Sequence, residues 1–161
     1  MAAVSDLVAH LRGRQMSLAT AESLTGGQLA AAVTSVPGAS AVYLGGVVSY
    51  ATEVKVGVLG VPEHLIRDHG VVSAQCAIAM ALGARELLGA VVAVSTTGVA
   101  GPDSQEGRPV GTVYVGIADA ERTEAHELAL GGTRAEIQAE TCLRAIDLLA
   151  RFIGGEETSV R

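Results

Sequence analysis

The sequence predicts an α/β fold, in which a three-layer α/β/α sandwich is built around a mixed, mainly parallel sheet. Helix-like and strand-like segments alternate along the first part of the chain, and two adjacent strand-like segments come late. The run AVVAVST at residues 90–96 is continuously apolar, which is typical of a strand covered by helices on both faces. At 161 residues the chain is long enough to bury one core. We expect a single domain over residues 1–153 and a flexible tail at 154–161.

The helices are predicted from their start signals and their apolar stripes. The apolar stripes are Leu7, Val8 and Leu11 within 5–14, Leu29, Val33 and Val36 within 26–36, Ala77, Met80, Ala81, Ala84 and Leu88 within 73–88, and Ile137, Ala145, Leu148, Leu149 and Phe152 within 133–152. Thr25 with Gln28 and Thr133 with Glu136 fit capping boxes, and Ser73 is a suitable N-cap.

The strands are predicted from apolar runs that are bounded by turn residues. They are expected at 16–21, 41–50, 90–96, 110–118 and 124–130. Residues 62–69 are predicted to form one or two helical turns. Residues 51–60 are mixed in polarity, and no element is assigned to them.

The composition excludes several classes of function. Aromatic residues make up 2% of the chain, so the stacking platforms of single-stranded nucleic-acid binders are missing, and the net charge of −6 opposes binding to a phosphate backbone. No apolar run approaches the roughly 18 residues of a membrane span, and the N-terminus lacks the apolar region of a secretory signal. Cys76 and Cys142 are expected as half-buried thiols in a reducing cytoplasm, and no metal-ligand spacing occurs.

Three segments at the ends of expected strands carry candidate chemistry, because ligands in such folds bind where strands end and helices begin. The first is ESLTGG at 22–27. Gly26 and Gly27 are expected to expose backbone N–H groups at a helix start, where an anion binds. Ser23 is a candidate nucleophile on this strand-to-helix corner, although a hydroxyl near a helix start is more often a cap. Glu22 either orients Ser23 or is a first-turn charge.

The second segment is SYATEVK at 49–55. A nucleophilic serine needs a base, and the four histidines are scattered among charged neighbours, so a Ser-His-Asp triad is disfavoured. A Ser-Lys arrangement is the natural substitute if burial keeps Lys55 neutral, with Tyr50 relaying or orienting the proton. The alternative is that Lys55 and Glu53 are a solvated pair at a strand end.

The third segment is TTGVAGP at 96–102, which follows the buried strand. Gly98 and Gly101 permit unusual dihedrals, so successive N–H groups can form an anion-binding nest or an oxyanion hole. The alternative is an ordinary connecting loop. The three segments together indicate a site for a small anionic substrate.

Several motifs, in this order, resemble those of a known family. They are AESLTGG at 21–27, SYATEVKVGVLGV at 49–61, GVVS at 70–73, TGVAGP at 97–102 and PVGTV at 109–113. Over about residues 5–153 the chain is similar to the CinA C-terminal domain family, in its stand-alone form of PncC-type nicotinamide-nucleotide amidases. The resemblance implies an α/β/α sandwich, commonly a homodimer, that hydrolyses nicotinamide mononucleotide to nicotinate mononucleotide and ammonia without a cofactor or a metal.

The resemblance also implies roles for individual residues. Ser23 matches the family's nucleophile, and Tyr50 and Lys55 match the residues proposed to activate it. The residues expected to bind the pyridine nucleotide are Glu22, Thr25, Gly26, Gly27, Thr97, Gly98, Ala100, Gly101 and Arg134. The positions that depart from the family's pattern are Thr52, residues 103–107, Thr133 and Gln138. The family often has an arginine where Gln138 stands.

The expected reaction is acyl transfer. Ser23 attacks the carboxamide carbon while a neutral Lys55, assisted by Tyr50, accepts its proton, and the phosphate lies on the N–H groups of Gly26 and Gly27. One alternative is an amidase for a related nucleotide or pyridine amide. Another is a non-catalytic module, associated with competence or DNA damage, that keeps a vestigial pocket. We expect a cytoplasmic homodimer with no nucleic-acid or membrane partner.

Overall fold

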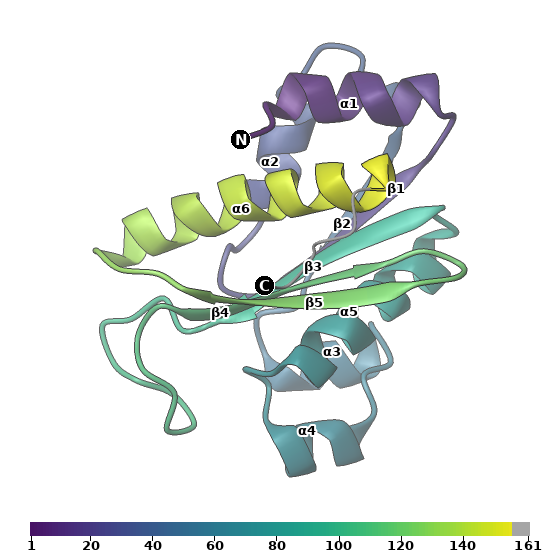
Figure 1. The fold of residues 1–161 in the computed structure, drawn as a ribbon. Coiled ribbons are helices and arrows are strands. Elements are labelled where there is room, and N and C mark those ends of the chain that lie inside the picture. The colour runs from purple at the N-terminus through teal and green to yellow at the C-terminus, as the bar shows by residue number, and fades with distance from the viewer. Residues whose placement is uncertain (156–161) are drawn as a thin grey trace.

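One sheet of five strands lies between two layers of helices in the computed structural model, which describes residues 1–155 (Figure 1). The strands are β1 (Leu18–Glu22), β2 (Tyr43–Val48), β3 (Val92–Gly98), β4 (Thr112–Ala118) and β5 (Thr123–Ala129), and their order in the sheet is β2-β1-β3-β4-β5. β1 pairs in parallel with β2 and β3, whereas β4 is antiparallel to both β3 and β5. Four strands therefore share one direction, and the predicted sandwich with a mixed sheet is confirmed.

The helices divide between the two faces of the sheet. One face is covered by α1 (Val4–Gly13), α2 (Gln28–Thr34) and α6 (Arg134–Gly154), and the other by α3 (Thr52–Gly57), α4 (Glu63–His69) and α5 (Ala74–Leu88), with a 3₁₀ turn at Ala39–Ala41 (Figure 1). All the predicted helices are present, with shifted ends. α3 was not predicted, and it forms within the segment 51–60 that carried no assignment.

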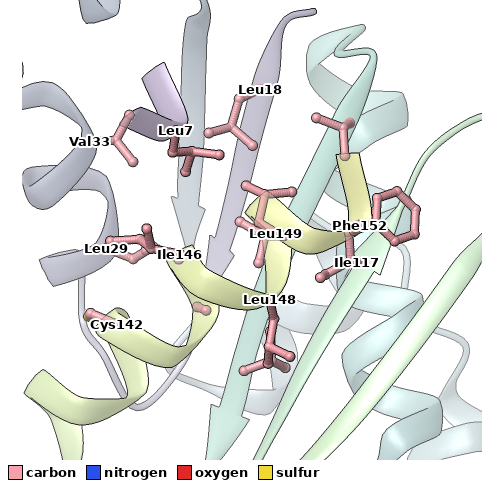
Figure 2. Packing of buried hydrophobic residues seen from close by; sticks show 14 of the residues in the cluster. Leu7, Leu18, Leu29, Val33, Ile117, Cys142, Ile146, Leu148, Leu149 and Phe152 are labelled. Carbon is pink, nitrogen blue, oxygen red and sulfur yellow. The ribbon is translucent and has the colours of Figure 1, made fainter. Parts of the chain in front are cut away.

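Each layer of helices has its own apolar core against the sheet. Leu7, Leu29 and Leu149 pack with Ile117 and Phe152 beneath α1, α2 and α6 (Figure 2). The second core lies under α5 and is built from small residues such as alanine and valine. Fully burying each leucine or phenylalanine stabilises the fold by about 1.5–3 kcal/mol. Because aromatic residues are few in this chain, aliphatic side chains supply most of this stabilisation.

Both cysteines are fully buried, not half-buried as predicted. Cys142 belongs to the core beneath α6, and Cys76 lies in the first turn of α5. Burial raises the pKa of Cys76 to about 11 and that of Cys142 to about 12. Both side chains are therefore neutral thiols at neutral pH.

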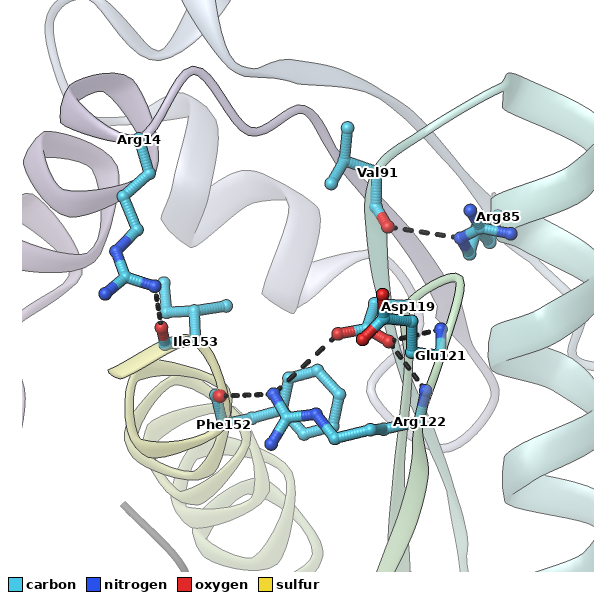
Figure 3. A network of polar contacts seen from close by, with 8 residues as sticks. All are labelled: Arg14, Arg85, Val91, Asp119, Glu121, Arg122, Phe152 and Ile153. Atoms are coloured by element: carbon cyan, nitrogen blue, oxygen red, sulfur yellow. Dashed lines mark hydrogen bonds and ion pairs between the residues drawn. The ribbon is translucent and has the colours of Figure 1, made fainter. Parts of the chain in front are cut away.

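Both ends of α6 are held in place, which fixes the residues that it brings to the carboxyl edge of β1. The predicted capping box of Thr133 and Glu136 is confirmed at its start. At its end, Arg14 Nη1 donates to Ile153 O at 2.6 Å and Arg122 Nη2 donates to Phe152 O at 2.8 Å (Figure 3). Gly154, which was assigned to a flexible tail, is the last residue of α6, and residues 156–161 of that tail lie outside the described residues.

Candidate active site

The three candidate segments meet at the end of the sheet where the parallel strands β1, β2 and β3 terminate. β1, β2 and β3 are parallel neighbours, and Glu22 at the end of β1 lies opposite both Val48 and Thr96. The Ser23 N–H donates to Thr96 O at 2.9 Å, which extends the ladder by one residue and holds the serine at the strand end. A cavity of about 370 Å³ opens there, and residues of all three segments line it.

Ser23 and Lys55 form a contact pair at the bottom of this cavity. Lys55 Nζ lies 2.9 Å from Ser23 Oγ and also donates to Ser49 O at 2.6 Å and to Tyr50 O at 3.4 Å. A neutral amine has two N–H groups and one lone pair. The two carbonyls take the N–H groups, so the lone pair is left to accept the Ser23 proton. The predicted Ser-Lys arrangement therefore has the required geometry, and the alternative of a solvated Lys55–Glu53 pair is excluded.

Lys55 is a buried lysine whose surroundings favour its neutral form. Its side chain is 2% exposed, and burial lowers its pKa from the ordinary value of 10.5. The charges of Cys76 and Glu106 act in the opposite direction. Because the Cys76 thiol is neutral at neutral pH, Glu106 is the one of these two neighbours that opposes the shift there.

Lys55 is also the only lysine in the chain, and all its other basic side chains apart from histidine are arginines. A guanidinium stays charged at any pH that a protein survives, whereas an amine can lose its proton. The residue that contacts Ser23 is thus a lysine, whose amine can lose its proton, and not an arginine. Lys55 faces Ser23 from α3. This helix begins shortly after β2, and Ala51 is its N-cap, with an extended backbone conformation.

Tyr50 lines the cavity, but its hydroxyl lies away from the Ser23–Lys55 pair. Tyr50 is 61% exposed and its hydroxyl accepts from Arg134 Nη2 at 2.8 Å, while Arg134 Nη1 donates to Gly101 O at 2.6 Å. The carbonyl of Tyr50, not its hydroxyl, contacts Nζ. The structure therefore joins Tyr50 to Arg134 across the mouth of the cavity, and the expected assistance by the Tyr50 hydroxyl stays a prediction.

Glu22 has a structural task that the sequence did not reveal. It is 1% exposed; its Oε1 accepts from Leu29 N at 2.8 Å and from Thr25 Oγ1 at 2.6 Å, and its Oε2 accepts from Ala30 N at 3.1 Å. The carboxylate thereby accepts hydrogen bonds from two N–H groups in the first turn of α2, and its negative charge interacts favourably with the helix dipole. The Glu22 side chain therefore caps this helix from the end of β1.

The predicted capping box of Thr25 and Gln28 is therefore wrong. Gly27 is the N-cap of α2, with φ of 102°, and it provides no side chain. Gly26 and Gly27 turn the chain with positive φ, which glycine adopts without strain, but neither they nor Thr25 line the cavity. The expected anion site on these glycines stays a prediction, and the buried Glu22 carboxylate, which accepts from Leu29 N and Ala30 N at the start of the same helix, places a negative charge beside it.

Glu22→Ala is expected to lower the free energy of unfolding by about 2–4 kcal/mol, because two backbone N–H groups and the Thr25 hydroxyl lose their buried acceptor. Urea unfolding followed by circular dichroism measures the change. Glu121→Ala, at an exposed turn, is the matched control and is expected to stay within about 0.5 kcal/mol. An equal stability of the Glu22 variant and wild type would contradict the capping role.

Backbone N–H groups around Ser23 are available to stabilise an oxyanion. The carbonyl of the Ser23–Leu24 peptide points into the turn, where it accepts from Gly26 N at 3.1 Å. The Leu24 N–H lies on the opposite side of the same peptide plane and therefore points out of the turn. Within residues 1–155, no protein group accepts a hydrogen bond from the N–H of Leu24, Ala100 or Gly101. All three residues line the cavity, as do Thr97 and Gly98.

Sequence reasoning missed two contacts that shape the site. Gln138 Nε2 donates to Leu24 O at 2.8 Å, so α6 holds the turn that carries Ser23. The Glu106 carboxylate accepts from Val71 N and ties the loop after β3 to the segment before α5. The one signal for both residues in the sequence was that they depart from the family's pattern, Gln138 by itself and Glu106 within residues 103–107.

The remaining candidates for chemistry lie elsewhere. Three of the histidines are exposed, and the fourth, His126, lies 3.0 Å from Glu124 on β5. In the described part of the chain, no group of three or more His, Cys, Asp or Glu side chains is arranged to hold a metal. None of the helices described over 1–155 combines the length and the apolar character that crossing a membrane requires.

Comparison with known proteins gives one consistent family. The model of the CinA C-terminal domain matches residues 2–153. A CinA-like protein of Frankia casuarinae is 49% identical over 142 residues, and a putative competence-damage inducible protein of Halalkalibacterium halodurans is 46% identical over 154. The matches cover 88% and 92% of this chain but 33% and 37% of the relatives, so the chain spans about a third of their length.

Solved structures agree with these relatives over nearly the whole chain. A CinA superfamily protein from Klebsiella pneumoniae superposes with a TM-score of 0.91 at 33% identity, covering 94% of this chain and 96% of that one. The competence/damage inducible protein CihA from Agrobacterium tumefaciens gives a TM-score of 0.86 at 32% identity, covering 96% and 97%. The match to the family model, over residues 2–153, includes all three segments of the cavity.

Proposed function

This chain belongs to the CinA C-terminal domain family, and we propose that it hydrolyses the carboxamide of nicotinamide mononucleotide to nicotinate mononucleotide and ammonia. The observation that carries the proposal is the distance of 2.9 Å between Ser23 Oγ and the buried Lys55 Nζ. A serine activated by a neutral amine is a nucleophile for acyl transfer. The resemblance supplies the substrate.

The first half of the reaction forms an acyl-enzyme. Ser23 Oγ attacks the carboxamide carbon and its proton passes to Lys55 Nζ, which gives a tetrahedral oxyanion. The N–H of Leu24 is suited to stabilise this oxyanion, as the residue after the nucleophile does on other strand-to-helix corners, with the N–H of Ala100 or Gly101 opposite. Lys55 then gives the proton to the departing nitrogen, the C–N bond breaks and ammonia leaves.

The second half releases the acid. A water attacks the ester carbon and passes a proton to Lys55, and a second oxyanion forms in the same place. The bond to Ser23 Oγ breaks, and Lys55 returns the proton to the serine. The products are the free enzyme and the pyridine carboxylic acid, which ionises to the carboxylate as the released ammonia takes up its proton to become ammonium, so the atoms and protons balance without a cofactor or a metal.

The nucleotide phosphate fits Arg134 better than the helix start first expected. Arg134 and Lys55 are the basic side chains that line the cavity in the part of the chain that the structure describes, and of the two Arg134 is the one that stays charged. Arg134 uses one N–H of each terminal nitrogen for Gly101 O and the Tyr50 hydroxyl, and its other N–H groups can bind phosphate oxygens. With glutamine at position 138, Arg134 carries this task alone. Homodimer assembly stays a prediction of the resemblance.

The test of this function is ammonia release from nicotinamide mononucleotide, measured as kcat/KM between pH 5 and pH 10. The neutral amine is the active form, so kcat/KM is expected to rise with pH and to level off above the pKa of Lys55 in the free enzyme. Because burial lowers that pKa, the midpoint is expected below 10.5. Free nicotinamide, which lacks the ribose phosphate, is the control and is expected to react at least about tenfold less efficiently. No ammonia release at any pH would refute the proposal.

A further inference from the structure

The loop between β3 and β4, residues 99–111, forms one wall of the cavity through Val99 to Gln105. It folds back on itself where Gln105 N donates to Arg108 O and Arg108 N donates to Gln105 O, at 3.3 and 2.8 Å. Glu106 lies at the tip of this fold with φ of 52°, a left-handed conformation that a residue other than glycine seldom adopts. Such a conformation at a loop tip needs a compensating contact.

That contact is made by the side chain of Glu106. Its Oε1 and Oε2 accept from the Val71 N–H at 3.0 and 3.1 Å. The Val71 carbonyl accepts from Thr97 Oγ1 at 2.7 Å, so the Val71 backbone is held from the loop on one side and from β3 on the other. The fit is close, because a Cβ added at Gly70 would collide with the Glu106 carboxylate.

We propose that Glu106 is a positioning residue, whose carboxylate latches the 99–111 loop onto Val71 and thereby forms the cavity wall against which the substrate is held. Val71 and Val72 line the same cavity as the loop, so the latch fixes how two segments of its lining lie relative to each other. The loop is also held at its ends, where Val99 N donates to Thr112 O and Gly111 N donates to Val99 O. Within it, Gly101 O accepts from Arg134 and Arg108 donates to the Tyr114 hydroxyl, but among the described residues the hydrogen bond from Val71 N is made by the Glu106 carboxylate. The catalytic pair does not touch Glu106, so the latch is expected to act on substrate binding.

The Glu106 charge gives the latch a second effect that can be measured apart from the first. The titratable groups whose charges act on Lys55 are Cys76 from α5 and Glu106 from the loop, and the same cavity is also lined by Asp103 from the loop and Arg134 from α6. The Glu106 carboxylate stabilises the ammonium of Lys55, so neutralising it is expected to move the acid limb of kcat/KM to lower pH. This charge effect does not depend on the hydrogen bond to Val71.

Two variants separate the contact from the charge, and this part of the test rests on the proposed function. Glu106→Gln keeps an acceptor oxygen for the Val71 N–H and removes the charge. We expect its KM for nicotinamide mononucleotide to stay within about twofold of wild type and its acid limb to move to lower pH. Glu106→Ala removes both, and its KM is expected to rise about tenfold, as the loss of one charge-assisted hydrogen bond predicts, with the same shift of the limb. Glu121→Gln, on the β4–β5 turn, is the matched control and is expected to change neither.

Amide hydrogen exchange at Val71 reads the latch without any turnover. The Val71 N–H is expected to exchange at least about tenfold faster in Glu106→Ala than in wild type, and to stay protected in Glu106→Gln. Unchanged exchange in Glu106→Ala, or equal KM values in the two variants, would overturn the latch. If wild type releases no ammonia, the proposed function fails, but the exchange rates still decide whether Glu106 holds the loop.

Discussion

Replacing Ser23 by alanine is expected to lower kcat for ammonia release by on the order of 10⁴-fold, because no other hydroxyl lies against Lys55 Nζ in the part of the chain described by the structure. The residual rate would come from the backbone donors and from substrate binding alone. The stability of this variant is expected to stay within about 1 kcal/mol of wild type, since the Ser23 side chain makes one contact and Lys55 keeps its two carbonyl partners. Single-turnover and steady-state ammonia assays measure the loss.

Ser40→Ala is the matched control for this experiment, because Ser40 is an exposed serine in the 3₁₀ turn, away from the cavity. We expect its kcat and KM to equal those of wild type. Turnover by the Ser23 variant within about tenfold of wild type would remove the serine from the mechanism and leave direct attack by water as the route. Binding of the substrate, measured by calorimetry, is expected to survive the substitution.

Replacing Lys55 by methionine is expected to lower kcat by about 10³-fold or more, since a general base contributes about 10²–10⁴-fold and this one also protonates the leaving nitrogen. Methionine fills a similar volume, so packing around α3 is retained. The pH dependence of kcat/KM that Lys55 imposes is expected to disappear with the side chain. A variant that kept the acid limb of wild type would show that another group titrates there.

The same substitution has a pH-dependent effect on stability, whose sign follows from the lowered pKa. Unfolded Lys55 binds a proton as the pH falls below 10.5, whereas folded Lys55 binds it only at lower pH, so the unfolded state is increasingly favoured over the interval between the two pKa values. The penalty is present at neutral pH and disappears above the ordinary value of 10.5. The difference in unfolding free energy between Lys55→Met and wild type is therefore expected to move in favour of the variant as the pH falls below 10.5, and to level off below the folded pKa of Lys55. Urea denaturation at several pH values measures it.

The parts of the fold that the sequence predicted are those decided by local signals. Ser73 and the Thr133–Glu136 pair cap α5 and α6 where expected, and the apolar run at 90–96 is the central strand β3. α3 escaped prediction because it has six residues, and its one buried side chain is the lysine. The charge of Lys55 did not indicate that it would be buried, because the carbonyls that accept from Nζ, those of Ser49 and Tyr50, belong to the segment after β2 and not to α3.

The errors at the β1–α2 corner have a related cause. Thr25 and Gln28 satisfy the local pattern of a capping box, but the Glu22 carboxylate reaches the same N–H groups from the strand. A charged acceptor is stronger than a hydroxyl, so it takes the helix start, and Thr25 donates to it instead. The proximity of Ser23 and Lys55 was predictable because parallel strands end together, whereas the direction of the Tyr50 hydroxyl depends on Arg134, 84 residues away in sequence.

The single lysine of this chain makes its central question open to direct spectroscopy. A protein labelled with ¹⁵N at lysine side chains would give one Nζ resonance, which belongs to Lys55 without any assignment experiment. The chemical shift of that nitrogen reports whether the amine is protonated, so a titration in the absence of substrate yields the protonation state of one atom. The base of the proposed reaction can therefore be observed at rest, independently of any rate measurement.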